Sequence, residues 1–278
     1  MFQYAAGRRL AETNGSVLKL DTSALKNCSL RKYELGVFNI REQFATESET
    51  DILTVTKQGI AEKALNRLFN RQARRPASFI AEKHFHFDPV ILKLKAPVYL
   101  DGYWQSEKYF IDIENTIRKE FTITLEQDAV NKKAAENIIG SESVSIHVRR
   151  GDYVSNEVTG RYHGVCSLEY YHTAIDMIAE KIEDPHFFVF SDEPDWAKKY
   201  LKSEYPVTCI DFNGEEKAYE DLRLMSQCKH HIIANSTFSW WGAWLCQDPD
   251  KMVYAPAKWF KDYSINTKDL LPLGWIRI

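Results

Sequence analysis

The sequence predicts an α/β protein built on parallel sheets, and two observations lead to this prediction. In the second half of the 278-residue chain, short apolar runs rich in β-branched and aromatic residues alternate with amphipathic segments of about a dozen residues. Polar or turn-forming residues separate each run from the next. Such alternation is typical of strand–helix–strand units, in which the crossover helix makes consecutive strands parallel.

The pattern places the elements of the second half. We expect strands at 143–149, 186–192, 207–211, 230–235 and 252–256. We expect helices at 167–182, 193–202 and 217–228, followed by a tryptophan-rich helix after residue 236. Pro194 lies in the first turn of its helix, where its missing N–H is harmless. Ser236 is a good N-cap for the last helix.

The first half shows a looser version of the same pattern. We expect helices at 1–15, 59–75 and 106–120, and strands at 16–21 and 97–102. The polar stretch 125–143 is the candidate linker. We therefore place two domains, at 1–135 and 136–278.

Composition narrows the class of protein. Hydrophobic content of 44% with 27% charged residues is typical of a soluble globular chain. A net charge of -3 gives no general attraction to nucleic acid. No apolar run approaches the roughly 20 residues that span a bilayer, and no signal-peptide pattern is present, so we expect a cytoplasmic location. Five scattered cysteines without a C-x-x-C pair indicate reduced thiols, not disulfides or a zinc site.

Polar side chains follow each predicted strand at the point where it ends. In strand order they are His147, Arg149 and Arg150; Ser191 and Asp192; Asp211; and Asn235, Ser236 and Thr237. Carboxyl ends of parallel strands meet at one edge of the sheet, where ligands bind. Paired guanidinium groups and a helix N-terminus both suit phosphate oxygens. The sequence therefore predicts a diphosphate site, with neither a P-loop nor a complete G-x-G-x-x-G motif.

Plainer explanations compete with some of these interpretations. The Arg-Gly-Asp run at 150–152 matches the tripeptide of integrin adhesion, but a buried strand leads directly into it. His147 alone would suit a hydrogen-bonded core position, and Asp192 could cap the following helix. The Asp-Pro-Asp run at 248–250 matches the D-x-D of metal-dependent sugar transferases, yet a turn is expected there. The tryptophans of 240–244 have helical spacing, which favours core packing over a sugar platform.

Six segments together resemble the motifs of bacterial α-1,2-fucosyltransferases of the glycosyltransferase family 11 type. They are MFQYAAGRRLA (1–11), YLDGYWQSEKYF (99–110), HVRRGDY (147–153), YHGVCSLEYY (162–171), FSDEPDW (190–196) and NSTFSWWGAWL (235–245). The resemblance implies an α/β fold of the GT-B type, in which two Rossmann-like domains face each other across a cleft. Residues 1–135 would form the acceptor side and residues 136–278 the GDP-fucose-binding domain.

The resemblance also implies an activity. Such an enzyme is an inverting glycosyltransferase that moves L-fucose from GDP-β-L-fucose to O2 of a terminal galactoside, in glycan or O-antigen polysaccharide synthesis. It needs neither a metal ion nor another cofactor, and it does not bind nucleic acid. Two alternatives stay open: a transferase on the same fold that uses another nucleotide sugar, and a catalytically weak sugar- or nucleotide-binding module. Peripheral contact with the inner face of a bacterial membrane also stays open.

Candidate roles follow from the matched motifs. The resemblance places Arg149 on the leaving β-phosphate, and Arg150 on the same diphosphate or on Asp152. Asp152 and His163 are the two candidates for the base, and Asp152 could instead brace Arg150. Asp221 takes the place of an aspartate that pairs with guanine in related α-1,6 enzymes, with a solvent-facing charge as the alternative. The further expected contacts with the nucleotide sugar are His147, Ser191, Asp192, Asn235, Ser236, Thr237 and Ser239.

The N-terminus departs from the family pattern, which begins with a short strand and a G-G-L-G-N-Q turn before M-F-Q-Y-A. This chain starts at that Met. We expect about 16 further residues upstream in the natural protein, the usual length of a strand and turn. The N-terminal domain would then lack its first strand and its glycine-rich turn.

Overall fold

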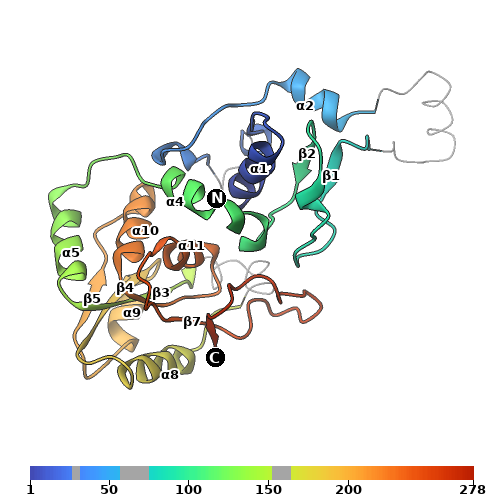
Figure 1. Cartoon of the computed structure of the whole chain (residues 1–278). Helices are drawn as coiled ribbons and strands as arrows, with labels where there is room; N and C mark the ends of the chain where they lie inside the picture. The colour runs from blue at the N-terminus through green and yellow to red at the C-terminus, as the bar shows by residue number, and fades with distance from the viewer. Residues whose placement is uncertain (27–31, 57–74, 152–163) are drawn as a thin grey trace. The chain divides into compact units, whose positions relative to one another are not determined.

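The chain forms two compact units. The computed structural model describes residues 1–26, 32–56, 75–151 and 164–278 (Figure 1). The first unit is Met1–Thr122 with Asn266–Leu270, and the second is Ile123–Ile265 with Leu271–Ile278. The division therefore lies before the predicted boundary at 135, because the helix that follows Thr122 packs within the second unit.

A parallel sheet organises the second unit. Its described strands are β3 (Glu142–Val148), β4 (Pro185–Ser191), β5 (Val207–Ile210), β6 (His230–Ile232), β7 (Val253–Ala255) and β8 (Ile276–Arg277). They lie in the order β5-β4-β3-β6-β7-β8, and every pairing is parallel. This is the strand order of dinucleotide-binding folds: the order in which successive strands are added to the sheet reverses between β3 and β6, although the two strands are parallel. The crevice at that reversal is where such sheets bind ligands.

Helices cover both faces of this sheet (Figure 1). They are α5 (Ala129–Ile139), α8 (Leu168–Ala179), α9 (Pro194–Tyr200), α10 (Ala218–Gln227) and α11 (Thr237–Leu245). Phe187 and Val189 of β4 share a core with α8 and α9, whereas the alternate residues Phe188 and Phe190 share another with α5 and α10. This two-sided burial explains why β4 is a continuous apolar run and not an alternating one.

The first unit has shorter elements. They are α1 (Phe2–Thr13), α2 (Glu47–Thr54), β1 (Phe79–Ala81), β2 (Tyr99–Asp101) and α4 (Glu114–Glu120). Strands β1 and β2 pair in parallel. Helices α1 and α4 are joined by the buried ion pair Arg8–Glu120, 2.9 Å between Nε and Oε1, and the Tyr4 hydroxyl donates to the same carboxylate. A Rossmann-like sheet in this unit stays a prediction, since the described strands are these two.

Short 3-10 turns complete the described elements. They are η1 (Ser23–Leu25), η2 (Leu35–Val37), η3 (Ile91–Lys93), η4 (Glu107–Tyr109), η5 (Ile111–Ile113) and η6 (Glu215–Lys217). The helix predicted over 106–120 is thus wrong in its first half: the backbone at Phe110, with φ of -148° and ψ of 6°, lies outside the helical region and interrupts it, and only α4 is α-helical.

Two other expectations are corrected. The strand predicted at 16–21 is wrong, because Leu20 makes only an isolated bridge to Phe44 among the described residues. The linker predicted at 125–143 is wrong as well, since α5 occupies most of it and buries Ala134, Ala135 and Ile138. The helix predicted at 59–75 lies outside the described residues except for Arg75.

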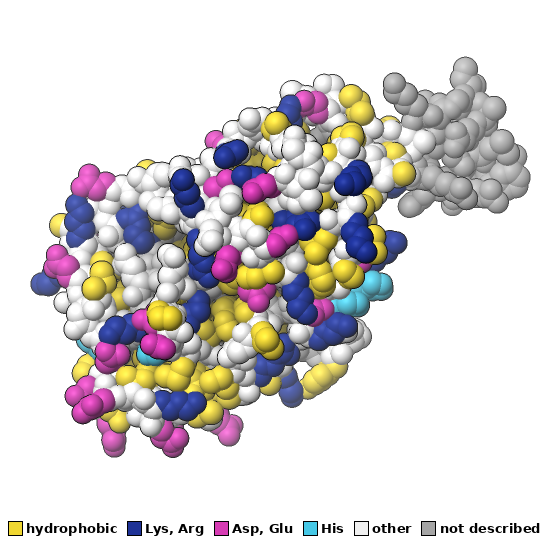
Figure 2. Space-filling model, in the orientation of Figure 1, with side chains coloured by type: hydrophobic (Ala, Val, Ile, Leu, Met, Phe, Trp, Pro, Cys, Tyr) yellow, Lys and Arg dark blue, Asp and Glu magenta, His cyan; other side chains and the backbone are white. Residues whose placement is uncertain are grey.

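The surface carries mixed charge. On the face shown in Figure 2, Lys and Arg side chains are interspersed with Asp and Glu, with no broad patch of either sign. This distribution agrees with the small net charge. No helix in the described part of the chain is long and apolar enough to cross a membrane.

Candidate nucleotide-sugar site

The carboxyl end of β3 is held by the aspartate that follows β4. Asp192 accepts hydrogen bonds from the backbone N–H groups of Arg150 (2.9 Å) and Gly151 (3.0 Å). The Nε of Arg149 lies 3.2 Å from Oδ2 of the same carboxylate. β3 and β4 are adjacent and end in register, with Val148 opposite Ser191, so the two strand ends meet as predicted. Asp192 therefore braces the arginine pair, a role that the sequence did not assign to it.

Arg150 is held from a second direction. Its Nε lies 3.3 Å from a carboxylate oxygen of Glu193, and its guanidinium carbon lies 4.1 Å from the ring centroid of Trp196. Both partners belong to the FSDEPDW segment at the start of α9. The stacked ring and the carboxylate fix the plane of the guanidinium, as expected for an arginine that recognises a planar group.

His147 is buried beside the first turn of α11. Its side chain is 5% exposed, and its ring centroid lies 5.5 Å from that of Phe238. Burial, followed by the charge of Arg149, lowers the pKa of His147 to about 3. The imidazole is therefore neutral at physiological pH, and its Nδ1 has no hydrogen-bond partner among the described residues. A buried, neutral imidazole is too weakly basic to hold a proton, so His147 is not a base at this edge of the sheet.

The N-terminus of α11 lies at the carboxyl end of β6, next to β3. Ser236 caps the helix by accepting from the N–H of Phe238 at 3.3 Å, which confirms the predicted cap. Ser239 is buried and donates to the carbonyl of Ser236, so its hydroxyl serves the first turn of the helix. Thr237 is partly exposed in that turn. The helix end and the arginine pair therefore flank the reversal of strand order.

Asn235 joins three segments of backbone. It is 2% exposed, and its amide nitrogen donates to the carbonyls of Gly164 and Trp259, both at 3.1 Å. Its amide oxygen accepts from the Cys166 thiol at 3.5 Å. These contacts give Asn235 a role in shaping the loops around the strand ends, while its predicted contact with the nucleotide sugar stays a prediction.

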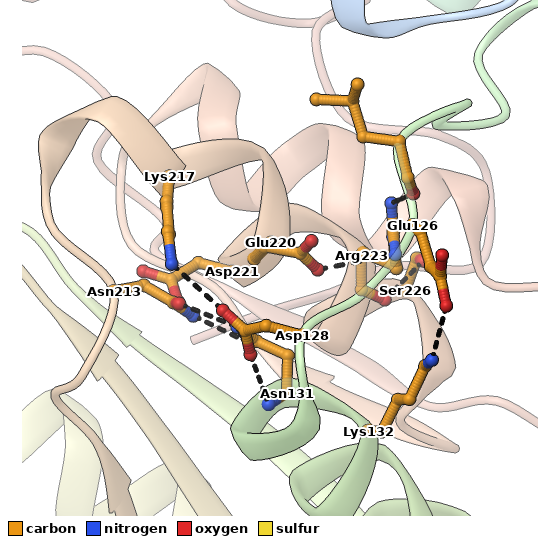
Figure 3. A network of polar contacts seen from close by, with 11 residues as sticks. Glu126, Asp128, Asn131, Lys132, Asn213, Lys217, Glu220, Asp221, Arg223 and Ser226 are labelled. Carbon is orange, nitrogen blue, oxygen red and sulfur yellow. Dashed lines mark hydrogen bonds and ion pairs between the residues drawn. The ribbon is translucent and has the colours of Figure 1, made fainter.

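Asp221 belongs to a polar network between α5, α10 and the end of β5 (Figure 3). Its Oδ1 accepts from the amide of Asn213 at 2.8 Å. Burial raises its pKa from the ordinary 3.8 to about 7, with a smaller contribution from the neighbouring charge of Glu220, while the Asn213 bond opposes the shift. Asp221 therefore lies in the first turn of α10 as a partly buried side chain, not as a fully exposed charge. Its contact with guanine stays a prediction.

This shift makes a prediction for stability. Because the pKa of Asp221 is raised on folding, the protonated carboxyl favours the folded state, and this contribution declines between pH 3.8 and about 7. Above pH 7 the native chain carries a desolvated carboxylate that Asp221→Asn removes. At pH 8 we expect the Tm of this variant to exceed that of the natural protein, by roughly 2–4 °C for each kcal/mol added to the free energy of unfolding. At pH 4 we expect the two Tm values to be equal. Thermal unfolding at both pH values tests this, and an equal shift at both would contradict it.

A second prediction concerns Asp192. Asp192→Asn keeps the shape of the side chain but turns one acceptor into a donor, facing groups that can only donate. We expect a roughly 10- to 100-fold loss of kcat for glycosyl transfer, because hydrogen bonds to a charged group are lost. Steady-state kinetics would measure this, with the exposed Asp195→Asn as the matched control. Equal kinetics of the two variants would show that Asp192 is not a brace.

The remaining predicted residues are placed as follows. Asp152 and His163 lie outside the described residues. Ser191 accepts from the N–H of Glu193, so it shapes the turn after β4. The Asp-Pro-Asp run forms a turn, in which the side chain of Asp248 accepts from the N–H of Asp250. The described residues contain no group of three or more side chains suited to hold a metal ion.

Comparison with known proteins identifies the family. Residues 77–278 match the model of a protein family that is described as Glycosyl transferase family 11. An Alpha-1,2-colitosyltransferase from Escherichia coli is 36% identical over all of this chain and 94% of its own length. The O-antigen biosynthesis glycosyltransferase WbnK, also from Escherichia coli, is 31% identical over all of this chain and 96% of its own. Galactoside alpha-(1,2)-fucosyltransferase 1 from Rattus norvegicus is 29% identical over 60% of this chain and 45% of its own. The chain therefore belongs to glycosyl transferase family 11.

Proposed function

We propose that the protein is an inverting α-1,2-fucosyltransferase, which transfers L-fucose from GDP-β-L-fucose to O2 of a terminal galactoside in glycan or O-antigen synthesis. One observation carries the proposal. At the reversal of strand order between β3 and β6, the arginine pair, the neutral His147 and the N-terminus of α11 come to one edge of the sheet. The guanidinium groups and the helix N-terminus favour the oxygens of a diphosphate.

The position of Asp221 supports a guanine nucleotide. β5 lies two strands from β3 in the sheet, a separation of roughly 10 Å at ordinary strand spacing. Asp221 and Asn213 lie beyond the carboxyl end of β5, at the edge that also carries the arginines. A nucleoside diphosphate can span this distance, with its phosphates at β3 and its base beside Asp221. An ionised carboxylate can accept from guanine N1–H and N2–H, which adenine and uracil cannot match.

The chemistry follows from charge. Displacement at the anomeric carbon passes through an oxocarbenium-like state while negative charge grows on the leaving diphosphate. Arg149 and Arg150, already braced by Asp192 and by Glu193, place positive hydrogen-bond donors where that charge develops. These fixed cations supply the role that a metal ion has in other transferases, so we propose that no metal is required. The base remains a choice between Asp152 and His163.

A second candidate is transfer of L-colitose, which is L-fucose without the 3-hydroxyl group. This candidate is favoured by the relative named as an Alpha-1,2-colitosyltransferase, whose match covers all of this chain and 94% of the relative. The two sugars share the anomeric centre, so the arginine site suits both. They differ in whether the pocket satisfies a hydroxyl group at C3.

One experiment separates these candidates. The full chain is incubated with GDP-fucose or GDP-colitose and a set of galactosides, with EDTA present or absent, and product linkage is determined by NMR. We expect an α-1,2 linkage, a higher kcat/KM with GDP-fucose, and no effect of EDTA. Preference for GDP-colitose would establish the second candidate. Binding of GDP without turnover of either sugar would indicate a nucleotide-binding module.

A further inference from the structure

A chain of side-chain hydrogen bonds leads from an exposed ion pair to Asp221 (Figure 3). It begins at Asp128, the N-cap of α5, whose carboxylate lies 2.9 Å from the ammonium of Lys217. Asp128 also accepts from the amide nitrogen of Asn131 at 3.0 Å. Asn131 and Asn213 form a reciprocal amide pair, with both N···O distances 2.9 Å. Asn213 then donates to Asp221 at 2.8 Å.

Each link of this chain fixes the orientation of the next. The backbone N–H of Asn131 and the side chain of Lys217 hold the pKa of Asp128 below its usual range, so this carboxylate only accepts hydrogen bonds. Asn131 must therefore turn its NH₂ group towards Asp128, which leaves its oxygen for Asn213. The NH₂ group of Asn213 donates one hydrogen to this oxygen of Asn131. The second hydrogen of the same NH₂ group is donated to Asp221. Asn131 is completely buried, so water does not compete for these bonds.

Asp221 is left with an unused oxygen. Its only hydrogen-bond partner among the described residues is Asn213, on Oδ1, and no partner contacts Oδ2 there. Each carboxylate oxygen has two lone pairs, so both oxygens can still accept from a ligand. A half-buried carboxylate that is oriented from one side and unpaired on the other is suited to a partner with two parallel N–H groups.

We propose that Asn213, oriented by Asn131 of α5, is a positioning residue that fixes the Asp221 carboxylate for recognition of the guanine base. The inference rests on the proposed function, since it assigns the base of the GDP-sugar to Asp221. Asn213 does not touch the base: it supplies the N–H that stabilises the ionised carboxylate and sets its plane. Helix α5, which lies N-terminal to the sheet in sequence, thereby takes part in base selection.

The test measures binding of GDP, IDP and ADP to the full chain by calorimetry between pH 5.5 and 8.5. IDP lacks the 2-amino group of guanine, and ADP lacks both N–H donors of that edge. We expect GDP to bind best, then IDP, then ADP, with the GDP preference increasing as Asp221 ionises. Other titratable or charged groups near Asp221 are Glu220 on α10, the Cys209 thiol on β5 and the Asp128–Lys217 pair, so the pH profile must be compared between variants.

Two variants remove the proposed N–H. Asn213→Asp keeps the size and shape but presents an acceptor to Asp221, and Asn213→Ala removes the group entirely. We expect both to reduce the GDP-over-ADP preference by about 10-fold, to leave ADP affinity unchanged, and to move the pH midpoint of GDP binding upwards. Lys132→Ala is the matched control, because its ion pair with Glu126 lies in the same region but outside the hydrogen-bond chain.

Asp221→Asn separates the two levels of the proposal. If it abolishes the preference for GDP while both Asn213 variants keep the natural preference and pH midpoint, the positioning role is overturned and the proposed function stands. If Asp221→Asn leaves the preference unchanged, the base contact itself is overturned. If Asn213→Asp does not fold, as judged by circular dichroism, the Asn213→Ala result decides.

Discussion

We expect Arg149→Ala to reduce kcat for glycosyl transfer by roughly 100- to 1000-fold, the usual loss when a fixed donor to a developing negative charge is removed. Arg149 follows the central strand β3 and is held by Asp192, so its charge is in place before the nucleotide sugar binds. Arg149→Lys should lose nearly as much, because an ammonium group cannot reproduce the planar fork that contacts both Asp192 and a phosphate. Initial-rate assays with GDP-fucose, or with GDP-colitose if that sugar is preferred, would measure kcat for both variants.

The control for Arg149 is Lys229, whose partner lies at the other end of β3. Lys229 pairs with Glu142, the first residue of β3, far from the carboxyl edge of the sheet. Lys229→Ala removes a positive charge from a half-exposed ion pair, which typically contributes little to stability. We expect the Lys229→Ala variant to have the same kcat as the natural protein. Near-natural turnover of both Arg149 variants would overturn the assignment of Arg149 to the leaving diphosphate.

The second large effect concerns stability. Trp240 is completely buried in α11, with ring centroids of Trp241, Trp275 and Trp244 at 4.9, 5.5 and 6.2 Å. We expect Trp240→Ala to lower the free energy of unfolding by about 3–5 kcal/mol, because removal of the indole leaves a large cavity. Denaturant unfolding followed by circular dichroism would measure the loss.

The surface residue Tyr263 provides the comparison. It is 78% exposed, so Tyr263→Ala should change stability by less than about 0.5 kcal/mol. A Trp240→Ala variant that keeps its stability but loses affinity for galactosides would restore the alternative of a sugar platform. The burial of the tryptophan cluster argues for core packing, the interpretation that its helical spacing favours.

The second unit could be predicted from the sequence because its strands are buried on both faces. Phe187 to Phe190 form a continuous apolar run for this reason, and runs of this kind stand out between polar turns. Strand β8 has only two residues and α5 has few large apolar ones, so neither gives a strong local signal. The stretch at 16–21 has the composition of a strand, but among the described residues it forms only one isolated bridge and no strand ladder.

The candidate site, too, could be predicted from the sequence only in part. The polar residues at strand ends were predictable, since topology alone brings carboxyl ends together. The partners of those residues were not, because they depend on which side chains meet across the fold. Asp192 is 41 residues from the Gly151 N–H that it accepts from, and Asn213 is 82 residues from Asn131. Nothing in local sequence distinguishes such a brace from a solvated side chain.

The central position of β3 has a consequence for binding. Ladders on both sides and a hydrophobic core against one face hold its backbone, so little conformational entropy is left to lose there when a ligand arrives. Arg150 is confined further by an aromatic ring on one side and a carboxylate on the other. Binding energy from the diphosphate is therefore not consumed in ordering the groups that hold it, and more remains to stabilise the departing charge.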